Sequence, residues 1–177
     1  MSGLHFEDEA ERLAYKAWRT LKLEPPADLD RVAEKLGLVV EYREFVPQID
    51  GFYLRLPHTP PIIAVNSSYV KPLERRRFTL AHEIGHHLLA RRISNPERLF
   101  FLDTERGRRS VLERACDRFA ALLLMPEDLV RSYFAELESN RSKRVAVMAS
   151  RFGVSTWAMR RRLRELGLNL WDKRRGG

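Results

Sequence analysis

Apolar residues recur at helical spacing in the first part of the chain. Between Glu7 and Leu21 they lie three or four residues apart, which is typical of one face of an amphipathic helix. Pro25 and Pro26 end this segment, and a shorter helix follows them, with Gly37 placed to terminate it. The apolar face of this second helix is formed by Leu29, Val32, Ala33 and Leu36.

Three short segments of β-type composition come next. We predict strands at Leu38–Phe45, Gly51–Leu56 and Ile62–Asn66. The last two are separated by Pro57-His58-Thr59-Pro60-Pro61, which has the length of a hairpin loop. A long helix is then predicted from about Pro72 to Arg91, because proline is tolerated in the first turn of a helix. The arginine-rich residues 97–110 are predicted to be irregular.

The rest of the chain is predicted to be helical. A strongly apolar helix runs from about Val111 to Met125, and three more follow at Glu127–Leu137, Lys143–Phe152 and Thr156–Leu166. A small antiparallel or mixed sheet packed on several helices is an α+β fold. We expect a core formed by residues 1–140 and a basic helical segment at residues 141–177 that packs on it.

The composition excludes several classes of protein. Of the 177 residues, 44% are hydrophobic and 32% are charged, which is typical of one globular domain. The single cysteine, Cys116, excludes an intramolecular disulfide framework and a zinc site built from several cysteines. No uncharged run is long enough to span a bilayer, and the N-terminus is acidic where a signal peptide would be basic. These features predict a cytoplasmic protein with no membrane partner.

The excess of positive charge lies in the C-terminal segment. Over the whole chain, Lys and Arg exceed Asp and Glu by 32 − 24 = 8. Residues 141–177 hold 11 basic and 2 acidic residues, a net charge of +9, so residues 1–140 carry −1. Such a segment is typical either of contact with an anionic partner, nucleic acid or an acidic protein face, or of a solvated, arginine-rich helix face.

The strongest chemical signal is His82-Glu83-Ile84-Gly85-His86, inside the predicted helix 72–91. Histidines four residues apart lie one turn apart on the same helix face, so both imidazoles can reach one tetrahedral zinc at about 2.0–2.1 Å. Glu83 is rotated by about 100° from His82, which places it beside the metal without coordinating it. This position suits a general base acting on a water at the metal.

Other residues of this helix and the remaining histidines are interpreted differently. His87 is one step out of register with the pair, so we expect it not to bind metal, and we expect His5 and His58 at the surface. A glycine at position 85 costs a helix interior about 1 kcal/mol relative to alanine. A glycine at this position is explained if another helix or strand packs closely against the side of the helix that faces the metal. The alternative interpretation of the motif is a helix that happens to carry surface histidines.

A third protein ligand is expected to be a carboxylate, because no histidine follows His87. Glu113, at the start of the apolar helix, is the best candidate for a His₂Glu site. Asp117 lies one turn later on the same face, where it can orient a ligand imidazole, with His82 preferred over His86 as its partner. The alternative is an exposed acidic pair on an amphipathic helix. Asp103 and Glu105 are weaker rivals as ligands.

The segments Arg77–His86 and Glu113–Pro126 together resemble the ImmA/IrrE family of metallo-endopeptidases. Asp50-Gly51, Ile62–Asn66 and Phe152–Ser155 fit the same family, and the resemblance covers roughly residues 10–168. It implies a zincin-like fold and a zinc peptidase that cleaves helix-turn-helix repressors, inducing mobile-element or DNA-damage genes.

The resemblance also implies roles for individual residues. His82, His86 and Glu113 would bind one catalytic Zn²⁺, and Glu83 would be the catalytic base. The position of Asp117 is often asparagine in the family. Radiation-response members carry an extra C-terminal sensor domain, which is not expected in a chain that ends at Gly177.

Residues 146–164 have helix-turn-helix character, with an apolar helix, a glycine-containing turn and an arginine-rich second helix. One interpretation is contact with DNA phosphates. The other, which the resemblance favours, is a helical pair that packs on the core; a third is docking of the repressor substrate. Packing would bury a set of apolar residues: Val147, Phe152, Val154, Trp157, Met159 and Leu163.

Taken together, the sequence predicts a zinc-dependent endopeptidase that hydrolyses peptide bonds of a helix-turn-helix repressor. We expect Ile62–Asn66 to bind the substrate chain by strand addition. The alternative function is a DNA-binding regulator whose peptidase centre is vestigial.

Overall fold

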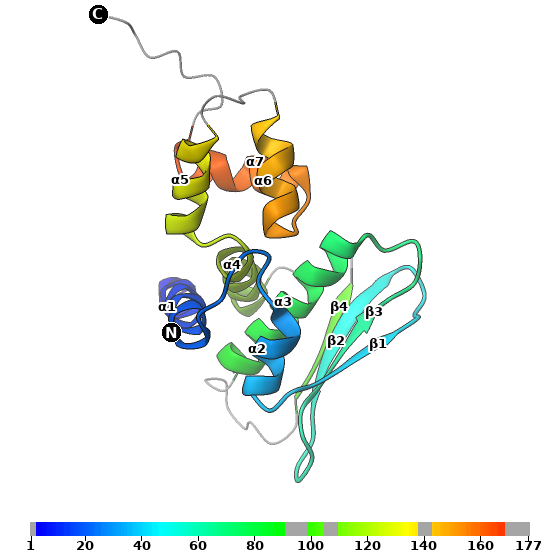
Figure 1. Cartoon of the computed structure of the whole chain (residues 1–177). Helices are drawn as coiled ribbons and strands as arrows, with labels where there is room; N and C mark the ends of the chain where they lie inside the picture. The colour runs from blue at the N-terminus through cyan, green and yellow to red at the C-terminus, as the bar shows by residue number, and fades with distance from the viewer. Residues whose placement is uncertain (1–2, 91–98, 105–109, 138–142, 169–177) are drawn as a thin grey trace, which may run out of the picture.

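A computed structural model describes residues 3–90, 99–104, 110–137 and 143–168 (Figure 1). It confirms the α+β fold class predicted from the sequence. The elements in chain order are α1 (Gly3–Leu21), α2 (Leu29–Lys35), β1 (Val39–Arg43), β2 (Ile49–Arg55), β3 (Ile62–Asn66), α3 (Leu73–Leu89), β4 (Leu99–Thr104), α4 (Val111–Leu124), α5 (Glu127–Glu136), α6 (Arg144–Phe152) and α7 (Thr156–Glu165).

The four strands form one mixed sheet in the order β1-β3-β2-β4. β2 and β3 pair antiparallel, with Gly51 opposite Val65 and Leu54 opposite Ile62, as the proline-rich loop between them predicts. β1 runs parallel to β3, and β4 runs antiparallel to β2. Because β3 lies between β1 and β2, both of its backbone edges are already paired. The expectation that Ile62–Asn66 binds a substrate by strand addition is therefore wrong.

β4 is a second correction, since residues 97–110 were predicted to be irregular. Its first four residues, Leu99-Phe100-Phe101-Leu102, are all apolar. A strand that is apolar on both faces shows no alternation of polar and apolar positions, which is the pattern by which a half-buried strand is identified. The residues that follow β4 in the sequence are rich in arginine, which makes the end of the strand harder to predict.

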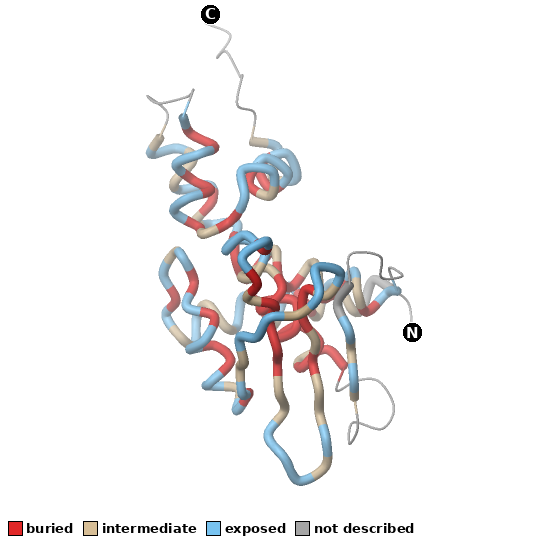
Figure 2. The backbone as a smooth tube through the Cα atoms, turned by 90° about the vertical axis from the view of Figure 1, so that its right-hand side faces the viewer, coloured by how far each residue is buried: buried red, intermediate tan, exposed pale blue. Residues whose placement is uncertain are grey.

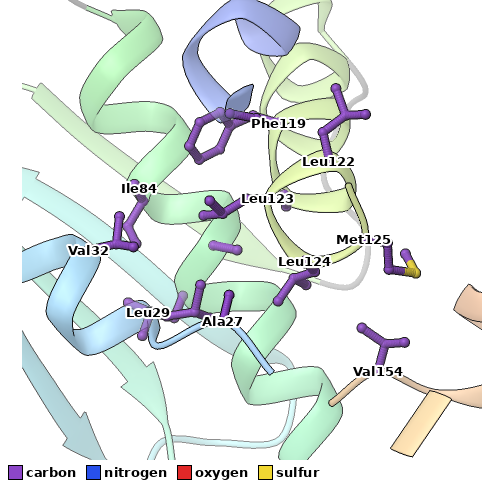
Figure 3. Close-up of a cluster of buried hydrophobic side chains, with 14 of the residues drawn as sticks. Ala27, Leu29, Val32, Ile84, Phe119, Leu122, Leu123, Leu124, Met125 and Val154 are labelled. Carbon is purple, nitrogen blue, oxygen red and sulfur yellow. The ribbon is translucent and has the colours of Figure 1, made fainter. Parts of the chain in front are cut away.

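All described helices lie on one side of the sheet (Figure 1). α3 packs against β2 and β3, and α4 packs against both α3 and α1. Figure 2 shows the buried residues concentrated where these elements meet. In this core, Ile84 of α3 lies beside Val32 of α2 (Figure 3) and belongs to the same cluster as Phe119 and Leu123 of α4. Ile84, Phe119 and Leu123 are all fully buried. None of the described helices is long and apolar enough to cross a bilayer.

A buried ion cluster fixes the start of α3 on the sheet. Asp50 of β2 is 2% exposed, and its carboxylate is paired with Lys71, at 2.8 Å, and with Arg75. Burial alone would raise the pKa of Asp50, but the hydrogen bonds from Arg75 and Lys71 hold that pKa below its usual value. These ion pairs hold the first turn of α3 against β2. They therefore help to fix the direction of the helix axis, along which the later residues of α3 lie.

The C-terminal helices pack on the rest of the molecule. Gly153 ends α6 in the left-handed region, at φ 63°, and Ser155 caps α7 by accepting a hydrogen bond from the backbone of Ala158. The Arg77 side chain of α3 donates to the Gly153 carbonyl at 3.1 Å, and the buried Arg162 donates to the Met125 carbonyl at 3.1 Å. These contacts join α6 and α7 to α3 and α4.

The expected burial of apolar residues in this pair is correct in part. Phe152, Val154, Met159 and Leu163 are buried in the common core. Val147 is 38% exposed and Trp157 is 68% exposed, so their predicted burial is wrong. Both lie on the exposed faces of short helices whose opposite faces carry the buried residues.

α3 and α4 approach each other closely at Gly85. A Cβ atom at this position would lie 3.2 Å from the Cα of Cys116 and 3.2 Å from a ring carbon of Phe119. These distances are shorter than ordinary van der Waals contact. The close approach predicted for this glycine is confirmed, and the approaching element is α4, which carries Glu113 in its first turn.

We predict that Gly85→Ala lowers the free energy of unfolding by about 1 kcal/mol, because overpacking of a tight core costs about 1–3 kcal/mol. Helix propensity alone predicts the opposite, a gain of about 1 kcal/mol. Urea unfolding of the metal-free protein distinguishes the two. A stabilised variant would show that α4 can move away from α3 at no cost.

Candidate metal centre

α3 places two histidines side by side in the protein interior. His82 and His86 are 3% and 1% exposed, and their Nε2 atoms lie 3.1 Å apart. The ring of Phe101, from β4, stacks on the ring of His86 with a centroid distance of 4.3 Å and an interplanar angle of 11°. The imidazole of His86 is therefore held between the helix that carries it and the sheet.

α4 brings a carboxylate to the same point. Ser110 caps this helix by accepting a hydrogen bond from the backbone N–H of Glu113, at 3.1 Å, so Glu113 lies in its first turn. Its two carboxylate oxygens lie 3.2 Å from Nε2 of His82 and 3.3 Å from Nε2 of His86. Three potential ligand atoms thus converge from two helices that are distant in the sequence.

A second carboxylate of α4 contacts the outer nitrogen of His82. Asp117 Oδ1 lies 3.0 Å from His82 Nδ1, and the Asp117 side chain is 48% exposed. If Nδ1 carries the proton and donates it to Asp117, Nε2 is left with a lone pair that points toward His86 and Glu113. Nδ1 of His86 is also buried, but it has no hydrogen-bond partner among the described residues.

The local electrostatics favour the ionisation states that metal binding requires. Burial would raise the pKa of Glu113, but hydrogen bonds with His82 and His86 lower that pKa to about 2. Burial lowers the pKa of His86 and outweighs the opposing effect of Glu113. At neutral pH the cluster therefore combines a carboxylate anion with an uncharged imidazole, and both are metal ligands in these forms.

The spacing of the three ligand atoms fits a zinc ion. Two ligands of a tetrahedral ion at 2.0–2.1 Å lie about 3.3 Å from each other. The Nε2 atoms of His82 and His86 are 3.1 Å apart, one Glu113 oxygen lies 3.2 Å from the first and the other Glu113 oxygen lies 3.3 Å from the second, so each separation is close to this value. Nitrogen and oxygen donors in this set are those of catalytic His₂Glu zinc sites, in which a fourth position stays open.

Glu83, the predicted base, follows His82 directly in α3. Its side chain is fully buried, at 0% exposure. A carboxylate is almost never buried to this extent unless it is paired or has a function. Its role as a base stays a prediction, supported by its complete burial next to His82 in the sequence.

The remaining predicted residues lie elsewhere. His87 is buried, its Nδ1 lies 3.1 Å from the hydroxyl of Tyr53 in β2, and it does not belong to the group of candidate ligands. His58 is exposed in the loop between β2 and β3. Asp103 lies in β4, opposite Gly51, but its side chain is outside the described part of the structure. Glu105 and the side chain of His5 are also outside it.

Phe101 is a neighbour of the site that was not predicted from the sequence. The available signal was the apolar run Leu99–Leu102, whose length fits a strand but which lies in a segment interpreted as irregular. Nothing in the sequence indicates that this strand pairs with β2, or that it places an aromatic ring on His86.

We predict that Asp117→Ala lowers zinc affinity about 10- to 100-fold, because removing the partner of a ligand imidazole typically has this effect. Asp117→Asn keeps a hydrogen-bond acceptor and should be mild. Competition with a chromogenic chelator measures both variants. Asp128→Ala, which removes an exposed carboxylate of α5, is the control. Wild-type affinity in Asp117→Ala would show that this carboxylate is only a solvated helix residue.

Comparison with known proteins agrees with this geometry. The model of the IrrE N-terminal-like domain, a peptidase family, matches residues 33–164. The radiation response metalloprotease IrrE of Deinococcus deserti is 44% identical over 91 residues, which cover 49% of this chain and 30% of that protein. IrrE of Deinococcus radiodurans is 42% identical over 72 residues, which cover 39% of this chain and 20% of that protein.

The chain therefore matches less than a third of the length of either relative. The family model, in contrast, spans α3 and α4 with all the candidate ligands, together with all four strands. It covers well over half of the chain. The protein belongs to the family of IrrE N-terminal-like domains.

Proposed function

We propose that the protein is a zinc-dependent endopeptidase. The observation that carries this proposal is the convergence of His82, His86 and Glu113, with contacts of 3.1–3.3 Å between their side chains. The fully buried Glu83 follows His82 directly in the sequence. Membership of a peptidase family supports it, and both relatives are metalloproteases by name.

Each residue has a distinct role in this proposal. His82, His86 and Glu113 hold the ion, and Asp117 fixes the tautomer and the orientation of His82. When bound, zinc lowers the pKa of a water to about 7 and polarises a peptide carbonyl. Glu83 accepts the proton of the attacking water and passes it to the leaving amine.

The edge of the sheet supports a binding mode for the substrate. Among the described residues, β4 pairs with β2 on one side and with no strand on the other. Its residue Phe101 contacts His86, so a peptide that pairs with this edge passes close to the candidate metal centre. We therefore assign strand addition to β4, in place of the interior strand β3.

We further propose that the substrate is a helix-turn-helix transcriptional repressor, cleaved in the cytoplasm to induce stress-response or mobile-element genes. The support is the family resemblance of Arg77–His86 and Glu113–Pro126. The radiation response named for the two relatives agrees with such a role. Incubation with the repressor encoded nearest to this gene, with and without a chelator, tests it directly.

We predict that Glu83→Gln keeps one bound zinc per chain but abolishes cleavage, because an amide cannot accept the proton of water at neutral pH. Glu113→Ala is the matched comparison, since it removes a ligand and should lower bound zinc sharply. Metal analysis and repressor cleavage are measured on both variants. Near-normal turnover of Glu83→Gln would overturn the assigned base, and full zinc content of Glu113→Ala would place the third ligand elsewhere.

The outer face of α7 supports a second candidate function, contact with nucleic acid. Its exposed residues are Thr156, Trp157, Arg160, Arg161, Arg164 and Glu165, while its other face is buried. They are mainly basic, although Glu165 pairs with Arg161 at 3.0 Å. In a helix-turn-helix pair, the second helix presents such a face to the DNA. The alternative is that it is a solvated face of a helix with a scaffold role.

A salt titration separates these alternatives. If α7 binds duplex DNA, the slope of log K against log salt should become less steep by about 0.9 for each phosphate that the protein no longer neutralises. We predict a change of about 1.8 for Arg160→Gln/Arg164→Gln and none for Arg12→Gln/Arg31→Gln, which removes two exposed arginines from α1 and α2. If the wild type does not bind DNA at low salt, the DNA-binding function is excluded and the scaffold role of α7 is the one that stands.

A further inference from the structure

Two large apolar side chains are exposed on the edge strand beside the candidate metal centre. Phe100 is 60% exposed and Leu102 is 46% exposed. They flank Phe101, whose ring points to the opposite face of the sheet and stacks on His86. The sheet face that carries Phe100 and Leu102 is the one that no described helix covers (Figure 1).

The neighbouring strand extends this apolar surface. Leu102 lies opposite Phe52 and Phe100 lies opposite Leu54 in the pairing of β4 with β2. The ring of Phe52 is 5.8 Å from that of Phe100 and 5.8 Å from that of Phe45. We call Phe45, Phe52, Phe100 and Leu102 the outer strip. Apolar residues on an exposed edge strand favour association, so proteins usually avoid them unless the surface binds a partner.

Strand geometry determines which residues of a bound peptide reach the outer strip. Side chains alternate between the two faces of a sheet, and directly opposite residues on paired strands have Cβ atoms about 4.5–5.5 Å apart. A peptide residue opposite Phe101 therefore faces His86. The residues before and after it lie opposite Phe100 and Leu102, on the other face. This holds for a parallel and for an antiparallel peptide.

We propose that Phe100 and Leu102 are specificity-determining residues that select apolar side chains at two substrate positions. The two positions are separated by one residue, which faces the candidate metal centre. The occupant of the outer strip is thus an extended segment of the protein substrate with apolar residues at alternate positions. This inference rests on the proposed peptidase function and on strand addition at β4.

The test is a change of specificity at a defined position. The zinc-loaded wild type is incubated with peptides made by digesting a bacterial proteome with a protease that cuts after glutamate, and new cut sites are identified by mass spectrometry. We expect enrichment of apolar residues at two positions separated by one. In Phe100→Glu one of these preferences should fall roughly two- to fivefold, with lysine or arginine favoured there instead.

Leu102→Glu should change the residue preference at the other substrate position and leave the preference at the first position unchanged. The control is Val39→Glu, which places the same charge at an exposed position of the opposite edge strand, β1, and should leave the whole profile unchanged. A merely structural role of Phe100 or Leu102 would lower all cleavage equally. It would not move the preference at one position.

A binding measurement gives a second readout. In the Glu83→Gln background, fluorescence anisotropy compares a labelled peptide carrying apolar residues at the two positions with one carrying lysine at one of them. Phe100→Glu should reverse the order of the two affinities. An unchanged order, or a cleavage profile that Phe100→Glu does not alter, would overturn the inference while the proposed peptidase function stands.

Other outcomes have distinct meanings. If the zinc-loaded wild type cuts no peptide and no repressor, the proposed function fails, and the inference fails with it. If sedimentation shows that the wild type is a dimer that Phe100→Glu dissociates, the occupant of the outer strip is a second copy of the chain. That result would overturn the selection of substrate residues.

Discussion

The contact between Gly85 and Cys116 determines where the parts of the candidate metal centre lie. α3 carries the two histidines and α4 carries Glu113, so the separation of these helices sets the distance between the imidazoles and the carboxylate. Helix axes usually lie 8–10 Å apart, depending on the side chains at the contact. With no side chain at position 85, the backbone of α4 comes close enough for Glu113 to reach both Nε2 atoms at 3.2–3.3 Å.

Two carboxylates in this molecule, the buried Asp50 and the half-buried Glu113, are stabilised in different ways. Asp50 lies between Lys71 and Arg75, so the chain itself supplies the opposite charge. The described partners of Glu113 are two imidazoles, and burial favours the uncharged form of His86. Among the described residues, Glu113 has no lysine or arginine partner like those of Asp50, so a bound cation would balance its charge. That difference separates a structural ion cluster from a site that suits a metal.

The parts of the site that follow from local geometry could be predicted from the sequence. The spacing of His82 and His86, the place of Glu83 and the one-turn separation of Glu113 and Asp117 depend only on the helical repeat. Strand order could not be predicted in this way, because pairing joins residues far apart in the chain. For that reason β3 was assigned an exposed edge and β4 was missed. Exposure of Trp157 likewise depends on which helix face finds a neighbour.

Pairing with β4 also limits the form in which a substrate can be cut. A peptide that adds to the edge of the sheet must be extended over several residues, with its backbone hydrogen bonds free to pair with β4. Residues inside a stable helix do not meet this condition, because their backbone groups are already paired within the helix. If the substrate is a helix-turn-helix repressor, the cut must therefore fall in a linker or in a segment that opens by local unfolding. In that case the stability of the repressor, as well as its sequence, would control the rate of cleavage.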